Sequence, residues 1–302
     1  MNSPSLRLLE DACRVPLERF VSARLGQNWQ VNEFKDLIDL ASHGCAILSD
    51  GVYPVFAKFS AAANALDQFE VELAGLRFLR QHTQVLTPTP LGVLSVQDGV
   101  ILVLEAAQPL ERGPRQWREI GLALARIHKT TGQRFGFETQ GYFGPLYQDN
   151  RPSPDPDWLG FYAERRLWPR LVGAIDSGHL PTQAIRQVER LITRLPALGI
   201  PACLPALLHG DAQQNNFIST AAGAMVVDPA VFYGSPEIDL AHVDYFQAVP
   251  EEVFLGYEEE MPIPLGFSAR RELWRIPTHL AMLTVGGPDY LEPLIRAVQS
   301  YL

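Results

Sequence analysis

The stretch that decides the fold is residues 207–216, Leu-Leu-His-Gly-Asp-Ala-Gln-Gln-Asn-Asn, followed by residues 226–230, Val-Val-Asp-Pro-Ala. In both places an apolar run ends in polar side chains, where burial would otherwise continue. Phosphoryl transfer needs a base that orients the acceptor hydroxyl, and an asparagine and an aspartate that hold divalent metal against the nucleotide phosphates. Asp211, Asn216 and Asp228 match these three roles in chain order. The spacing therefore predicts phosphoryl transfer from a nucleotide with the help of a divalent metal.

Two motifs resemble known kinases. The pattern H-G-D-x-x-x-x-N, with an aspartate twelve residues after the asparagine, resembles the catalytic loop and metal-binding aspartate of aminoglycoside-phosphotransferase-like kinases. Residues 228–241, Asp-Pro-Ala-Val-Phe-Tyr-Gly-Ser-Pro-Glu-Ile-Asp-Leu-Ala, resemble the more specific D-P-A-x-x-Y-G-x-x-E-x-D-L-A stretch of the fructosamine (ketosamine-3) kinase family. Further likeness in residues 135–137, 158–167 and 266–270 extends the resemblance over nearly the whole chain.

This resemblance implies a fold and a reaction. The expected fold is α+β and bilobal, protein-kinase-like, with a small β-rich N-lobe and a larger, mainly helical C-lobe. The expected reaction is ATP- and Mg2+-dependent phosphorylation of a sugar hydroxyl of a ketosamine, a fructosamine-type glycation adduct. The expected partner is therefore a small or protein-linked glycated amine.

The sequence of the first hundred residues predicts a region rich in strands, with one helix. Short apolar runs at 45–48 and 53–59 flank the turn cluster Ser-Asp-Gly at 49–51, which predicts a hairpin. Apolar residues between 69 and 79 recur at helical spacing, so a helix of about three turns is expected there. The β-branched run at 99–105 predicts a buried strand.

A break after this strand divides the chain into an N-lobe, 1–106, and a C-lobe, 107–302. The Gly- and Pro-rich stretch at 132–156 is too long for an ordinary connection and predicts a functional loop or lid. Helical periodicity dominates the C-lobe. Helices are expected at 117–128, 158–171, 181–195, 271–283 and 290–302.

The N-lobe offers a nucleotide site. Kinase-like sites use a strand lysine to contact the α- and β-phosphates and a helix glutamate to hold that lysine. Lys58 lies in an apolar run, and Glu72 lies beside the inward stripe of the expected helix, where it would be costly to bury without a cationic partner. The sequence therefore predicts a Lys58–Glu72 pair, with backbone groups of Glu105, Ala106 and Ala107 binding adenine at the hinge.

Two residues are expected to support the catalytic loop. His209 is interpreted as a buttress of the loop rather than as a metal ligand or general base. Asp239 precedes Leu-Ala and could be an ordinary helix N-cap. A structural role for Asp239, steadying the catalytic loop, is favoured.

Four side chains are candidates for the acceptor site. Gln213 and Gln214 lie two and three residues after the expected base. Trp158 and Trp168 could line a sugar pocket, although aromatic residues at helical spacing more often belong to a core.

The sequence departs from the family pattern at two places. The phosphate-covering loop is usually rich in glycine, but residues 40–45 contain only Gly44, so backbone groups of Ser42 or His43 would assist Lys58 in holding the phosphates. A tryptophan usually stands two residues after the catalytic aspartate, where this chain has Gln213. Two alternatives therefore stay open: a kinase of another small alcohol, such as an aminoglycoside, a choline-like alcohol or a sugar, and a nucleotide-binding module without turnover.

Composition excludes several other classes of protein. With 302 residues, 47% hydrophobic and 20% charged, the chain is typical of a globular protein rather than a disordered one. A formal net charge of -9 disfavours nucleic-acid binding. No apolar run approaches the length needed to cross a bilayer, and the start does not resemble a signal peptide. Three cysteines without ligand spacing favour reduced thiols in the cytoplasm, and a monomer or weak dimer is expected.

Overall fold

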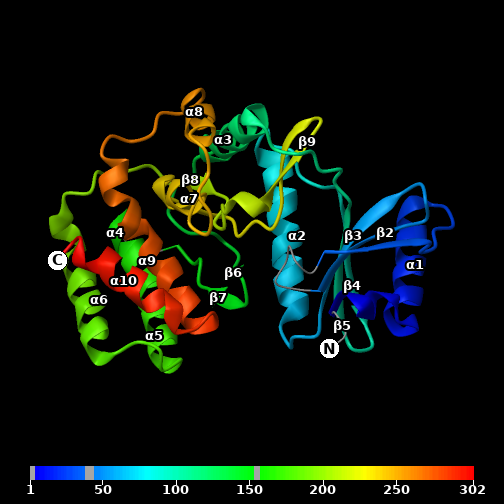
Figure 1. Ribbon diagram of the computed structural model, residues 1–302, viewed down its shortest axis with the longest axis horizontal. Coiled ribbons are helices and arrows are strands. Elements are labelled where there is room, and N and C mark those ends of the chain that lie inside the picture. Colours follow the sequence, from blue (N-terminus) through cyan, green and yellow to red (C-terminus); the bar gives the residue numbers. More distant parts are fainter. Residues whose placement is uncertain (1–3, 38–43, 153–156) are drawn as a thin grey trace. The chain divides into compact units, whose positions relative to one another are not determined.

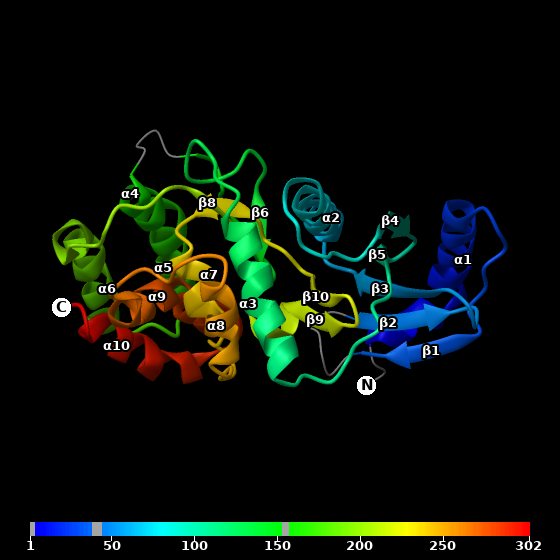
Figure 2. The same ribbon diagram turned by 90° about the horizontal axis from the view of Figure 1, so that it is seen from above.

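The computed structural model describes residues 4–37, 44–152 and 157–302. The chain forms two compact units, each of which has its own core (Figures 1 and 2). The first unit comprises Met1–Gln116 together with Asn215–Pro229, and the second comprises Trp117–Gln214 together with Ala230–Leu302. The boundary predicted at 106–107 assigned all of 215–229 to the C-lobe, whereas the contacts of this segment lie in the first unit.

A five-stranded antiparallel sheet forms the first unit, with strand order β1-β2-β3-β5-β4. The predicted hairpin is present, and Asp50 fixes its turn because its carboxylate Oδ1 accepts the N–H groups of Val52 and Tyr53 at 2.9 and 2.7 Å. The predicted strand at 99–105 is also present, as an interior strand of the sheet. The strands are β1 (Glu33–Asp36), β2 (Gly44–Ser49), β3 (Pro54–Ser60), β4 (Pro90–Val96) and β5 (Gly99–Glu105).

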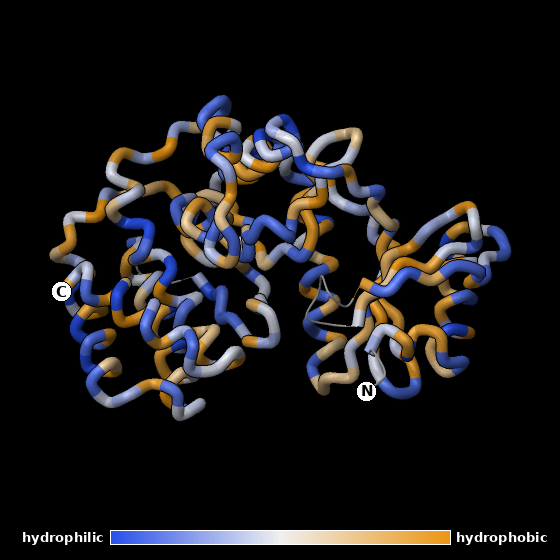
Figure 3. The backbone as a smooth tube through the Cα atoms, viewed as in Figure 1, coloured by the Kyte–Doolittle hydropathy of each residue, from blue (hydrophilic) through white to orange (hydrophobic). Residues whose placement is uncertain are grey.

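Helices cover both faces of this sheet. Strand residues alternate between faces, so Val55 and Ala57 pack with helix α1 (Asp11–Leu25), while Leu102 and Leu104 pack with helix α2 (Ala65–His82). The central strands are accordingly hydrophobic along their length, whereas both helices alternate in hydropathy (Figure 3).

The expectation of one helix in this region is wrong, because α1 is a second one. Its buried face is narrow, consisting of Cys13, Leu17 and Val21. The helix also contains Pro16 and several charged residues. The apolar periodicity was therefore too weak to predict a helix.

A short hairpin that follows the catalytic loop completes the first unit. It consists of β9 (Phe217–Thr220) and β10 (Gly223–Val226). Backbone hydrogen bonds attach it to the unit: Leu110 N–H donates to Ser219 O at 2.7 Å, and Val226 N–H donates to Leu86 O at 2.8 Å.

The second unit is mainly helical, as predicted. The amphipathic patterns at 117–128, 181–195, 271–283 and 290–302 all form helices, although the last ends before the chain does. These helices are α3 (Pro114–His128), α6 (Thr182–Arg194), α9 (Phe267–Val285) and α10 (Leu291–Gln299), joined by α7 (Glu237–His242) and α8 (Glu252–Glu258) and by the strand pair β8 (Ala206–Leu208) and β11 (Phe232–Gly234). None of the described helices is long and apolar enough to cross a membrane.

The stretch at 132–156 is not an irregular lid throughout. It contains the hairpin of β6 (Gly141–Phe143) and β7 (Leu146–Gln148), which periodicity could not reveal because each strand has only three residues. The helix predicted at 158–171 follows as α4 (Trp158–Tyr162), a π-helical turn at Ala163–Leu167, and α5 (Trp168–Asp176).

Candidate active site

Lys58 reaches Glu72 because of strand register. Lys58 pairs with Leu102 across β3 and β5, so both side chains point to the face that α2 covers. Glu72 lies one helical turn from the buried Phe69 on α2 and therefore faces the sheet. The Lys58 Nζ donates to Glu72 Oε2 at 2.8 Å, so the expected ion pair is present.

Asp228 is the third member of this network. The Lys58 Nζ lies 3.2 Å from Asp228 Oδ1, so one ammonium group serves two carboxylates. Burial of Glu72, together with the charge of Asp228, raises the pKa of the Glu72 carboxyl, which Lys58 only partly offsets. The two carboxylates raise the pKa of Lys58 more than burial lowers it. The second Glu72 oxygen, Oε1, is buried without a hydrogen-bond partner in the described part of the chain.

The backbone at Asp228 is held in an unusual conformation. Its φ is +50°, a left-handed value that aspartate and asparagine tolerate better than most residues. The preceding Val227 N–H donates to Asn216 O at 2.9 Å and so ties the Asp228 backbone to Asn216. Conformations of this kind cost about 1–3 kcal/mol and are concentrated at functional sites.

A cavity of ≈ 320 Å³ lies within the first unit beside this network. Its size suits a small-molecule ligand, and its wall includes Asn216, Asp228 and the three predicted hinge residues. At the hinge, the N–H of Glu105 donates to Thr89 O at 2.9 Å and that of Ala106 to Pro54 O at 3.2 Å. The N–H of Ala107 has no acceptor within the described ranges.

Asn216 and Asp228 fit a magnesium site only if the ligand contributes. Among the residues that the structure describes, no group of three or more His, Cys, Asp or Glu could hold a metal. Mg2+ is commonly held by one or two protein oxygen ligands together with substrate phosphates and water. The amide oxygen of Asn216 and the carboxylate of Asp228, on the wall of one cavity, are such a pair.

The catalytic loop belongs to the second unit and is fixed by Asp239. The Asp239 Oδ2 accepts the N–H of His209 at 2.6 Å, and its Oδ1 accepts the N–H of Gly210 at 3.0 Å. Gly210 has φ +81°, and a Cβ there would collide with the carbonyl of Ala230. The loop therefore needs glycine at this position and an acceptor at Asp239.

A histidine and a tyrosine complete this support. His128, at the end of α3, places Nε2 3.1 Å from Asp239 Oδ2, and its Nδ1 lies 2.9 Å from the Tyr257 hydroxyl. Burial alone would raise the pKa of Asp239, but bonds from His128 and the His209 backbone hold it below its usual value. Asp239 is thus an ionised, fully hydrogen-bonded carboxylate, which is more than an N-cap.

Polar groups surround the Asp211 carboxylate. The His209 Nδ1 accepts the Asp211 N–H at 3.2 Å, the buttress that the sequence predicted. Gln213 Nε2 lies 3.5 Å from Asp211 Oδ2, and His242 Nδ1 lies 3.7 Å from Asp211 Oδ1. Burial lowers the pKa of His242 to about 4, so this imidazole is neutral at pH 7.

The other predicted substrate residues lie elsewhere. Gln214 is buried and donates to Gln247 Oε1 at 2.8 Å. Trp158 is buried in an aromatic cluster, against Phe161 and Trp274, so its packing agrees with the core interpretation. Trp168 is 40% exposed on α5. The backbone groups of Ser42 and His43, expected to help hold phosphate, lie outside the described residues.

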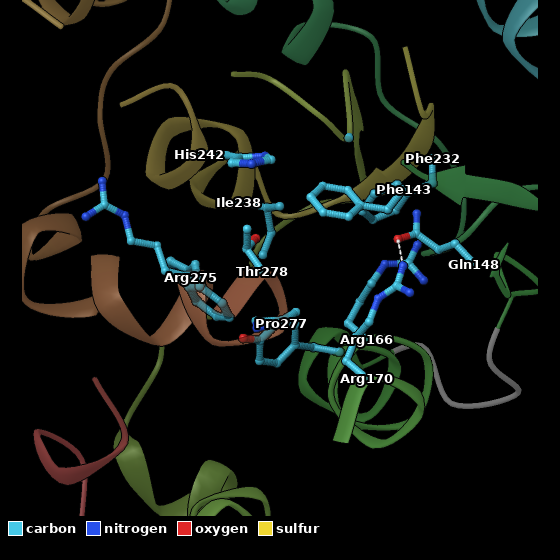
Figure 4. A pocket seen from close by; sticks show the side chains of 13 residues that line it. Phe143, Gln148, Arg166, Arg170, Phe232, Ile238, His242, Arg275, Pro277 and Thr278 are labelled. Atoms are coloured by element: carbon cyan, nitrogen blue, oxygen red, sulfur yellow. Dashed lines mark hydrogen bonds between the residues drawn. The ribbon is translucent and has the colours of Figure 1, made fainter. Parts of the chain in front are cut away.

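A second cavity, of ≈ 40 Å³, lies wholly within the second unit. Neither Trp158 nor Trp168 is among the described residues that line it. Gly210 and His242 border it, and the side chains of Arg166 and Arg170 project into it (Figure 4). The sequence analysis missed these arginines. The only available signal was their spacing of four residues within a predicted helix, which places them on one face.

Comparisons with known proteins agree with this description. The model of the family described as fructosamine kinase matches residues 16–302. A "Probable ketoamine kinase" of Vibrio cholerae is 29% identical over 286 residues, covering 93% of this chain and 96% of the relative. Another relative of that description, from Synechocystis, is 30% identical over 93% of this chain and 94% of its own.

Solved structures show the same fold. A crystal structure from Thermobifida fusca, assigned as a fructosamine-3-kinase, has a TM-score of 0.79 and 29% identity, covering 94% of this chain and 98% of its own. An aminoglycoside phosphotransferase in complex with AMP-PNP and hygromycin B has a TM-score of 0.59 at 15% identity, over 94% and 95% of the chains, which supports the kinase-like fold alone. This chain belongs to the fructosamine kinase family and is a ketosamine kinase, an ATP-dependent phosphotransferase that acts on a hydroxyl group.

Proposed function

We propose that this chain phosphorylates a sugar hydroxyl of a fructosamine-type glycation adduct, with Asp211 as the catalytic base and with Mg2+ held by Asn216 and Asp228. The observation that carries the proposal is the Lys58 ammonium bound between Glu72 and Asp228, beside a cavity of ≈ 320 Å³. A cluster with two acids for one base, in which Lys58 and Glu72 are largely buried, favours a ligand that brings positive charge. Mg2+ with a nucleotide does so.

The nucleotide side of the proposal rests on three groups. Lys58 aligns the phosphates, and Glu72 fixes the lysine through its 2.8 Å contact. Adenine lies against Glu105–Ala107. Because the N–H groups of Glu105 and Ala106 already have backbone acceptors, the hinge donor to adenine is the N–H of Ala107.

The metal would supply charge neutralisation at the transferred phosphoryl group. Asn216 and Asp228 would hold it. The left-handed backbone at Asp228 and its tie to Asn216 fix the Asp228 carboxylate before any ligand binds. Such preorganisation is the main contribution that a protein makes to phosphoryl transfer.

On the acceptor side, Asp211 accepts or orients the proton of the sugar hydroxyl. Asp239 and His209 hold the loop backbone, so the position of the Asp211 carboxylate does not depend on the substrate. Gln213, 3.5 Å from Asp211, offers its amide to the sugar where relatives in the family have an indole. Action in the cytoplasm, as a monomer or weak dimer and without nucleic acid, stays a prediction from the sequence.

The test is ATP-dependent turnover of a fructosamine by Asp211→Asn. We expect kcat to fall about 10²–10⁴-fold, the range typical for loss of a general base. The matched control is Asp176→Asn, the same substitution at an exposed position at the end of α5, which should leave kcat unchanged. Full turnover by Asp211→Asn would contradict the assigned base. Turnover of an aminoglycoside or choline-like alcohol, with none on ketosamines, would contradict the proposed acceptor.

A further inference from the structure

The small cavity of the second unit presents two positive charges side by side. We infer that Arg166 and Arg170 form a subsite for a carboxylate group carried by the acceptor, which makes the substrate a ketosamine of an amino acid. This inference rests on the proposed function and names its substrate class. Figure 4 shows the two guanidinium groups next to each other, with Gln148 at their tips.

Both arginines are buried, and their hydrogen-bond partners among the described residues are neutral. Arg166 is 5% exposed and Arg170 is 8% exposed. Arg166 donates to Asn150 Oδ1 at 2.7 Å and to backbone carbonyls, while its Nε has no partner within the described residues. In the same part of the chain, Arg170 makes one weak hydrogen bond, 3.5 Å to Gln148 Oε1.

The nearby carboxylates are engaged by other cations. The Asp149 carboxylate binds Arg151 and Arg165, at 2.7 and 3.0 Å. Within the described ranges, no carboxylate lies at ion-pair distance from Arg166 or Arg170. Burial lowers the pKa of Arg170 to about 10, and burial together with its neighbour lowers that of Arg166. A buried charge is costly unless it is paired, so this pair favours an anion.

The cavity is small, ≈ 40 Å³, and two guanidinium groups project into it. Guanidinium groups match a planar carboxylate through paired hydrogen bonds. The lining therefore favours a small planar anion such as a carboxylate.

The position of the cavity connects it with the acceptor. Gly210 of the catalytic loop lines it, and so does His242, which lies 3.7 Å from the Asp211 carboxylate. An anion bound there is adjacent to the catalytic loop. A ketosamine formed on an amino acid carries its carboxylate near the sugar, which suits a subsite at this position.

Substitutions of Arg170 can distinguish anion binding from a purely structural role. Arg166 also packs over the ring of Phe232 at 4.0 Å, so its loss would disturb the core. Arg170 makes few contacts beyond the cavity, the nearest ring being Phe143 at 5.7 Å. Arg170→Met keeps an unbranched stem and removes the charge, and Arg170→Lys keeps the charge.

The experiment compares two ligands that differ by one charge, fructosylglycine and fructosylglycinamide. Their affinities are measured by calorimetric titration, with no turnover required, and kcat/KM follows separately. In the wild-type chain we expect fructosylglycine to bind about tenfold more tightly than fructosylglycinamide, because hydrogen bonds to a charged group are stronger than hydrogen bonds to a neutral group. Arg170→Met should abolish this preference and leave the affinity for fructosylglycinamide within about twofold, and Arg170→Lys should retain part of it.

The control is Arg186→Met, the same substitution at an exposed position of α6, which should keep the preference. Equal wild-type affinities would overturn the subsite, even if the variants failed to fold. An equal loss for both ligands in Arg170→Met would also overturn it, because that result indicates a structural role. If the binding preference is present but neither ligand is phosphorylated, the proposed reaction fails while the subsite stands.

Discussion

Each unit of this protein contains a carboxylate network, and the two networks differ in how completely they are satisfied. In the second unit, Asp239 accepts two backbone N–H groups and one imidazole, and the imidazole is in turn bonded to Tyr257. In the first unit, Lys58 is shared by Glu72 and Asp228, and one Glu72 oxygen has no partner among the described residues. The first network also borders a large cavity.

The difference teaches what each network is for. A closed set of hydrogen bonds stabilises the fold and positions the loop that carries Asp211. An incomplete set with surplus negative charge costs stability and is retained for a ligand that completes it. The same substitution, aspartate to asparagine, should therefore have opposite consequences in the two units.

The largest effect is expected from Asp228→Asn. Loss of a metal-binding carboxylate should reduce kcat/KM about 10³-fold, or about 4 kcal/mol. The free energy of unfolding should stay unchanged or rise, because the Asp228 charge that disfavours ionisation of Glu72 disappears and asparagine also tolerates the left-handed backbone. Steady-state kinetics and urea denaturation measure the two quantities. A loss of stability above about 2 kcal/mol would show that Asp228 stabilises the fold, which would contradict the proposed difference between the two networks.

Asp239→Asn should have the second-largest effect, and on stability. The amide cannot accept all three donors as an ionised carboxylate does, so we expect the free energy of unfolding to fall by about 3 kcal/mol. Urea denaturation of this variant and of Asp228→Asn is compared under the same conditions. An unchanged midpoint for Asp239→Asn would show that its bonds contribute little to the fold.

A smaller effect is expected in the pH dependence of stability. The folded-state pKa of Glu72 is raised from 4.5 to about 8, so the folded state binds a proton that the unfolded state releases. This carboxyl therefore stabilises the fold at low pH, and its contribution is lost as pH rises through that interval. The unfolding free energy of wild type relative to Glu72→Gln should therefore fall as pH rises through this interval. A difference that does not vary with pH would contradict a raised pKa.

The smallest effect is expected at an ion pair near solvent. Glu260 binds Arg126 and Lys129, whose side chains are 40% and 51% exposed. Exposed pairs contribute about 0–1 kcal/mol. Glu260→Gln should thus change the free energy of unfolding by less than about 1 kcal/mol and leave kcat unchanged. A larger change would contradict the expectation that an exposed network contributes less to the free energy of unfolding than a buried one.

Much of the fold was predictable because its signals are local. The hairpin around Asp50, the helix that carries Glu72 and the strand at 99–105 follow from turn chemistry and periodicity over a few residues. Helix α1 was not predicted because its apolar stripe is narrow and interrupted by Pro16. The hairpin β6–β7 was not predicted because its strands are too short to show an alternation of apolar and polar residues.

The sequence by itself was enough to predict which side chains carry the reaction. Asp211, Asn216 and Asp228 were assigned from spacing, and the Lys58–Glu72 pair from the cost of burying a glutamate on an apolar helix face. Both inferences use the separation of residues along the chain. The regular geometry of strands and helices converts such separations into positions in space. They needed no knowledge of which distant segments pack together.

Only the tertiary structure decided which partners complete these groups. The contacts of Asp239 with His128 and of Lys58 with Asp228 join residues more than a hundred positions apart. Residues 215–229 pack with the first unit although they follow the catalytic loop of the second. Arg166 and Arg170 became a candidate subsite only once burial and the absence of an acidic partner in the described residues were known. Local spacing cannot encode such pairings, because they depend on how separate elements share one core.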